Sequence, residues 1–201
     1  MATEPEKVVP PVEAAPVTEP EKGAPPPATR GPTDYFAVAD VVLRFLVFAS
    51  SLVAVVIMST SKETEIIPPS PVPRPAKFNH SPAFIYFVAA LSVAGFFSII
   101  TTIGSLYSLL KPGCSAKIIS HFIIIDVLLL GMVASATGAA ASVAYIGLKG
   151  NNHVLWGKVC GMYGKFCRYL AASIGVSLFA TVVLVLLVLL SVYSLSKKIP
   201  K

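Results

Sequence analysis

The sequence predicts an all-α membrane protein that folds as a bundle of four transmembrane helices. Of its 201 residues, 55% are hydrophobic and only 13% are charged, a balance that soluble domains of this length rarely show. Four apolar stretches, near residues 38–59, 83–110, 118–147 and 169–195, reach the length of about 20 residues that crosses a bilayer. We therefore expect a four-helix membrane domain over residues 35–196.

Two polar tails are predicted to flank this domain. Residues 1–34 are rich in Pro, Ala and Glu, and the motif TEPEK occurs twice in them. Such a segment cannot bury enough apolar surface to offset its ordering entropy, so it is predicted to be disordered. Residues 197–201 form a short basic tail. Because the N-terminus lacks the pattern of a removable signal peptide, we expect the first helix to act as the insertion signal.

The loops and the last helix have distinct sequence patterns. Residues 59–82 are dense in proline and are expected to be extended. Pro112 and Gly113 are expected to end the second helix in a short basic turn. The fourth helix contains the aliphatic run TVVLVLLVLL, which is typical of a helix that faces lipid.

Four spans place both tails on one side of the membrane, but charge does not say which side. The positive-inside rule counts basic residues near the spans, and seven fall on each side. The tail side has Lys22, Arg30, Lys111, Lys117, Lys197, Lys198 and Lys201, and the other side has Lys62, Arg74, Lys77, Lys149, Lys158, Lys165 and Arg168.

Two cysteines bear on this question. Cys160 and Cys167 flank GMYGKF, and a regular helix would hold them about 10 Å apart, too far for a disulfide. The two glycines allow the segment to turn back, so a disulfide is feasible, and it would require an oxidising, non-cytosolic compartment. In that case both tails are cytoplasmic; the alternative is a pair of free thiols.

Charged residues inside the spans are expensive, so they are expected to face the protein interior and to find partners. Arg44 lies about six residues inside the first helix and Asp126 about eight inside the third, which puts them at depths of about 9 and 12 Å. Since these two helices run in the same direction, we predict an intramembrane ion pair between Arg44 and Asp126. Asp40, one turn before Arg44, competes for the same guanidinium.

Two roles are open for this pair. It either holds the first and third helices in register or forms part of a proton or ion relay. A transport path normally needs further ionisable groups or broken helices at the midplane. His121 is the other titratable candidate, and we expect it to be an interfacial polar residue.

Small residues recur at helical spacing in the second and third helices, where they let helix backbones approach closely. They are expected to pack helices within the bundle or between copies of the chain. The residues selected are Ala94, Ser98, Gly131, Ser135 and Gly138.

The sequence has no pattern typical of an enzyme, a cofactor site or a metal site. It lacks HExxH, CxxC and a phosphate-binding glycine loop. Its basic residues are scattered at the membrane flanks, which argues against a nucleic-acid partner. We therefore expect the lipid bilayer and other proteins to be its partners.

Four stretches together resemble the Casparian strip membrane protein family, in its Casparian strip membrane domain-like branch of group 1 plant proteins. They are VVLRFLVFASSLVAVVIM with its arginine, AKFNHSPAFIYFVAA, the aspartate of the third helix, and VCGMYGKFCRYLAASIGVSLF. The resemblance covers about Val38 to Lys198.

This resemblance implies a plasma-membrane protein with cytoplasmic termini, related to the four-span MARVEL proteins. It implies homo- and hetero-oligomers with related members, membrane subdomains, and guidance of local cell-wall modification, with the intramembrane pair at Arg44 and Asp126. The first outer loop, EIIPPSPVPRPAKF, departs from the strip-forming members, so a scaffold in another process is expected. The alternatives are a small ion or solute transporter that uses this pair, and an adaptor that recruits a partner through its proline-rich tail.

Overall fold

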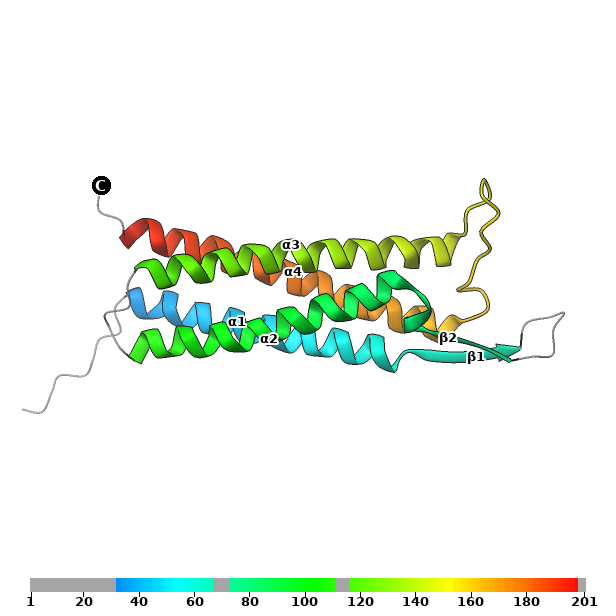
Figure 1. The fold of residues 1–201 in the computed structure, drawn as a ribbon, viewed down its shortest axis with the longest axis horizontal. Coiled ribbons are helices and arrows are strands. Elements are labelled where there is room, and N and C mark those ends of the chain that lie inside the picture. The colour runs from blue at the N-terminus through cyan, green and yellow to red at the C-terminus, as the bar shows by residue number, and fades with distance from the viewer. Residues whose placement is uncertain (1–31, 67–72, 111–115, 199–201) are drawn as a thin grey trace, which may run out of the picture. The chain divides into compact units, whose positions relative to one another are not determined.

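The computed structural model describes residues 32–66, 73–110 and 116–198. Most of the predicted N-terminal tail, the turn at Pro112 and Gly113, and the last three residues lie outside these ranges. Four long helices dominate the described part (Figure 1), and each contains a stretch long and apolar enough to cross a membrane. The predicted fold class is therefore confirmed. The helices are α1 (Pro32–Thr60), α2 (Pro82–Leu110), α3 (Ala116–Lys149) and α4 (Gly164–Lys198).

The helices run alternately up and down and pack as a ring. α1 packs against α2 and α4, and α3 packs against the same two neighbours. As a result, α1 and α3 lie diagonally across the bundle and run in the same direction (Figure 1). Any contact between these two helices must therefore cross the centre of the bundle.

The bundle is apolar on the outside as well as inside. Its core consists of tightly buried side chains such as Val47, Phe87 and Leu184. Large apolar side chains such as Ile103 and Leu128 are more than 60% exposed on the outer surface. In water such a surface would drive aggregation, whereas in a bilayer lipid tails cover it.

The expectation that α4 is a smooth lipid-facing helix is wrong for one of its faces. Leu184 and Leu187 are buried in the core, and the hydroxyl side chains of Ser173 and Ser177 are fully buried as well. Ser173 donates a hydrogen bond to the Ala54 carbonyl of α1 (2.7 Å), and Thr137 of α3 donates to the Ser177 hydroxyl (3.2 Å). An aliphatic sequence does not distinguish a lipid-facing side from a core-facing side, because both are apolar.

The small residues divide into two groups. Ala94 and Ser98 of α2 are buried between helices, as an internal packing role requires. Gly131, Ser135 and Gly138 of α3 are exposed, and a side chain added at either glycine would meet nothing within 4 Å. Gly131 and Gly138 therefore do not pack closely against another helix of the bundle, and of the two uses left open only contact between copies of the chain remains for them. Ser135 does contact a neighbouring helix, since it shares a hydrogen bond with the Tyr86 hydroxyl of α2. The inward face of α3 is instead formed by the buried residues Leu129, Val133, Ala136, Thr137 and Ala140.

A β-hairpin that the sequence did not predict follows α1. Strands β1 (Lys62–Ile66) and β2 (Pro73–Lys77) pair antiparallel, with Lys62 opposite Lys77. The prolines predict an extended segment, and two of them lie in β2. A two-stranded ribbon has free edges on both strands, so the missing N–H groups of these prolines are tolerated. A short 3₁₀ turn, η1 (Phe78–His80), then leads into α2.

The hairpin is bonded to the start of α4. The backbone N–H of Phe166 donates to the Glu63 carboxylate (2.9 Å), and the Tyr163 hydroxyl donates to the Arg74 carbonyl (2.8 Å). Phe166 is the third residue of α4, so its N–H lacks a partner within the helix. The hairpin between α1 and α2 therefore supplies the N-terminal cap of α4.

Replacing the capping carboxylate tests this contact. We expect Glu63→Ala to destabilise the protein by about 1 kcal/mol, because one helix N–H loses its acceptor and the helix end loses a favourable charge. Glu65→Ala on the same strand is the matched control, since no hydrogen bond joins Glu65 to α4 in the described residues. Thermal unfolding in detergent should show a lower midpoint for Glu63→Ala only, and equal midpoints would contradict the cap.

Candidate functional site

Arg44 lies in α1, with its side chain only 3% exposed. Arg44 lies within the apolar span Val38–Thr60 of α1, and Asp126 lies within the apolar span Ser120–Lys149 of α3. Both charged groups therefore lie in helix segments that are long and apolar enough to cross a membrane.

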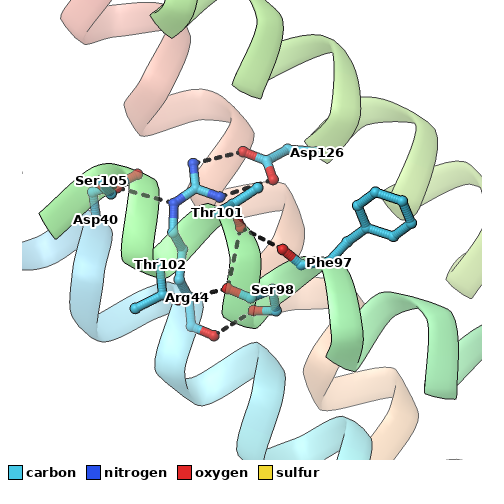
Figure 2. A network of polar contacts seen from close by, with 8 residues as sticks. All are labelled: Asp40, Arg44, Phe97, Ser98, Thr101, Thr102, Ser105 and Asp126. Atoms are coloured by element: carbon cyan, nitrogen blue, oxygen red, sulfur yellow. Dashed lines mark hydrogen bonds and ion pairs between the residues drawn. The ribbon is translucent and has the colours of Figure 1, made fainter. Parts of the chain in front are cut away.

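The guanidinium of Arg44 binds the Asp126 carboxylate with two parallel hydrogen bonds (Figure 2). Nη1 donates to Oδ1 at 3.0 Å and Nη2 donates to Oδ2 at 2.8 Å. This fork geometry is the strongest arrangement available to an arginine and a carboxylate. The structure thus brings the two predicted partners together, and their contact crosses the diagonal of the bundle.

Asp40 does not compete with Asp126 for the guanidinium. Arg44 Nε donates to Asp40 Oδ2 at 3.0 Å, so Arg44 binds both carboxylates at once (Figure 2). The reason is geometric: Nε points back along its own helix toward the preceding turn, whereas the two Nη atoms point across the bundle. Asp40 remains 17% exposed and also accepts a hydrogen bond from the Ser105 hydroxyl of α2.

α2 contributes a polar stripe beside this centre. Ser98 donates to the Arg44 carbonyl at 2.7 Å, and the buried Thr101 hydroxyl bonds to carbonyls of its own helix. Ser98, Thr101 and Ser105 follow one another at helical spacings, so they lie on one face of α2. Ser98 was selected from the sequence as a packing residue only, and Ser105 was missed, although their shared spacing is visible in the sequence.

The ring of Phe122 covers the guanidinium from the α3 side. Its centroid lies 5.9 Å from Arg44 Cζ, within the range of a cation–π contact. A side chain added at Gly104 would lie 2.6 Å from the tip of this ring. A glycine at position 104 therefore leaves the space that Phe122 occupies.

Chemically, this centre holds one cation between two carboxylates, with little access to water. His121 is exposed and makes no hydrogen bond or ion pair with the three charged residues in the described part of the chain. Within the same ranges, no group of three or more His, Cys, Asp or Glu side chains could hold a metal ion. The arrangement is suited to fixing helices relative to one another.

The second predicted site lies at the other end of the bundle. Cys160 and Cys167 are joined by a disulfide, with their Cα atoms 5.6 Å apart. Cys167 belongs to the first turn of α4, whereas Cys160 lies in the irregular segment before it, which turns back at Gly161. Two hydrogen bonds from the Val159 and Cys160 N–H groups to the Gly147 carbonyl tie this segment to the end of α3.

These features define an integral membrane protein of four antiparallel helices, with a buried arginine centre near one end and a disulfide-closed loop at the other. The chain belongs to the Casparian strip membrane protein family, whose domain matches residues 33–183. This is a family of membrane proteins and not a known class of enzyme.

Several plant proteins are similar to this chain over most of its length. "CASP-like protein IN26" of Ipomoea nil is 59% identical over 178 residues, which cover 85% of this chain and 91% of the relative. "CASP-like protein 1D2" of Glycine max is 58% identical, and "CASP-like protein 1D1" of Populus trichocarpa is 54% identical, each over 87% of this chain and 91% of the relative. No solved structure matches the chain.

Alanine substitutions test the arginine centre. We expect Arg44→Ala to be the most harmful, because it leaves two carboxylates without their cation, at a cost of about 3–5 kcal/mol. Asp126→Ala should cost less, since Arg44 keeps Asp40. The double variant should lose less stability than the sum of the two single variants.

The measurements are the yield of monodisperse protein and the thermal midpoint in detergent. Asp40→Ala is the control for a carboxylate nearer the interface, and it should have the smallest effect. Strictly additive losses for Arg44→Ala and Asp126→Ala would contradict an energetic coupling between them.

Proposed function

We propose that this protein is a plasma-membrane scaffold that associates with copies of itself and with related family members to form membrane subdomains. The observation that carries the proposal is the arginine centre. The charged groups deep in the described spans bind one another in a buried cluster, which suits a rigid structural unit. Through such subdomains the protein would guide local cell-wall modification, in cooperation with wall-modifying proteins, as the family resemblance implies.

The proposal places both termini in the cytoplasm and the disulfide loop outside the cell. Its support is the bond between Cys160 and Cys167, because disulfides persist in oxidising compartments. The β-hairpin lies at the same end of the bundle, bonded to α4 beside the disulfide. The hairpin and the disulfide loop would together form the surface that faces the cell wall.

Self-association is proposed to use the outer face of α3. Gly131 and Gly138 lie there with open space around them, so a second helix backbone could approach closely. Ser135 lies between them and bonds to the Tyr86 hydroxyl of α2 (2.9 Å), which fixes the orientation of this face relative to its neighbour.

A second candidate function is a small ion or solute transporter subunit. The observation in its favour is that Asp40, partly exposed near the interface, is linked through Arg44 to the buried Asp126. The bidentate bond to Arg44 argues against it, since a relay group must release its partner in each cycle.

Lateral mobility tests the scaffold. A fluorescent fusion in the plasma membrane of a plant cell should recover slowly and incompletely after photobleaching. A Gly131→Leu, Gly138→Leu double variant should recover faster, because the leucines keep a second helix at a distance. Gly175→Leu on the outward face of α4 is the matched control, and it should recover as slowly as the natural chain. Fast, complete recovery of the natural chain would refute a self-supporting scaffold.

Flux measurements test the transporter. Vesicles containing the purified protein, with a pH-sensitive dye inside, should show no proton or ion flux above that of empty vesicles. Flux that Asp126→Asn abolishes would favour the transporter and would count against a purely structural role for the arginine centre.

A further inference from the structure

An apolar cavity of about 530 Å³ lies at the disulfide end of the bundle. Three helices and one loop line it: Phe84 comes from α2, Gly147 from α3, Leu170 from α4, and Trp156 from the loop between α3 and α4. In Figure 1 this loop is drawn in yellow at the end of α3. The size falls within the range of sites that bind small ligands.

The cavity lies beside the ends of two apolar spans. Its deepest lining residue in α3 is Val143, six residues before the span ends at Lys149. In α4, Leu170 lies six residues after the span begins at Gly164. The cavity thus extends about 9 Å along the bundle from the helix ends. Water would find too few polar partners to fill such a space, whereas lipid lies directly beside it.

Four basic residues lie next to the lining residues of this cavity in the sequence, or within two residues of them. Lys158 lies between the lining residues Gly157 and Val159, and Arg168 follows the lining residue Cys167. Lys149 and Lys165 lie within two residues of other lining positions. All four side chains are exposed, and none forms an ion pair with any carboxylate of the described residues. The one carboxylate bonded to this part of α4, Glu63, accepts the Phe166 N–H.

The loop holds its tryptophan against the cavity in a defined conformation. Asn151 and Trp156 exchange two backbone hydrogen bonds of 2.9 Å. Between them Leu155 has a positive φ of 57° and is 90% exposed, and Trp156 is 56% exposed. A positive φ is unfavourable for leucine. Lipid beside this loop would supply apolar groups that cover the exposed leucine and tryptophan.

We propose that this cavity binds one acyl chain of an anionic phospholipid, whose phosphate is held by the surrounding cations. The apolar lining selects the chain, and the unpaired cations select the charge of the headgroup. Lys158 and Arg168 are the principal phosphate ligands, since each is adjacent to a lining residue. This inference does not depend on the scaffold function, so either can fail alone.

Trp156 provides a direct probe, because it is the single tryptophan of the chain. Bromine atoms on an acyl chain quench tryptophan fluorescence on contact. The full-length protein is placed in phosphatidylcholine vesicles with increasing fractions of either brominated phosphatidylglycerol, which is anionic, or brominated phosphatidylcholine, which is neutral. Half-maximal quenching should need about fivefold less of the anionic lipid, because nearby cations attract it.

Different variants test the binding of the headgroup and the binding of the acyl chain separately. The double variant Lys158→Gln, Arg168→Gln should lose the preference for the anionic lipid over the neutral lipid. Its quenching by the neutral lipid should be unchanged. The control is the double variant Lys62→Gln, Lys77→Gln on the hairpin, which should keep the preference for the anionic lipid. Gly147→Leu, which extends a side chain at a lining position, should weaken quenching by both lipids.

Gly175→Leu, the same change on the outward face of α4, is the control for Gly147→Leu. Its Trp156 fluorescence should be quenched by both lipids as much as in the natural chain. Equal quenching by both lipids in the natural chain would overturn the anionic site. Full quenching in Gly147→Leu would show that Trp156 touches bulk lipid only and would overturn the chain in the cavity. Absence of quenching by either lipid, with Trp156 covered by a second copy, would overturn the proposal entirely.

Discussion

The pairing of Arg44 with Asp126 is the contact on which the rest of the bundle depends. In lipid, helices gain little from hydrophobic association, so polar contacts and close packing must fix their positions. This pair acts across the diagonal, between the two helices that do not pack extensively together. It therefore sets the axial register of α1 against α3, and α2 joins the same centre through Ser98 and Ser105.

α4 is held by different means, mostly farther along the bundle. Ser173 bonds to α1, and Thr137 of α3 bonds to Ser177. Near the disulfide, Glu63 caps the first turn of α4 from the hairpin. Near one end of the bundle α1 and α3 are thus joined by charge, and α2 joins them through hydroxyl groups. α4 is held by hydroxyl groups and, at the other end, by the hairpin and the disulfide loop. Each helix has at least one polar contact that fixes its position in a largely apolar environment.

Much of this was predictable from residue types. Apolar length predicted four helices, and the similar depths of Arg44 and Asp126 in two helices that run in the same direction predicted their contact. The sequence could not predict that Gly131 and Gly138 face outward. Adjacent rows of small residues on α3 have the same spacing, so only the tertiary packing determines which row faces the core. The hairpin was missed because prolines in β2 argue against a strand, and Glu63 could not be assigned as a cap without knowing that the hairpin folds back onto α4.

The hydrogen bonds between the hairpin and α4 have a mechanical consequence. β1 follows α1 and β2 precedes α2, so a load on the hairpin would pull on those two helices alone if the hairpin stood free. Glu63 and Tyr163 divert part of that load into the start of α4, beside the bond between Cys160 and Cys167. Tension applied at the hairpin is therefore shared by three helices, and the covalent link beside Phe166 resists the fraying of α4 where the force enters it.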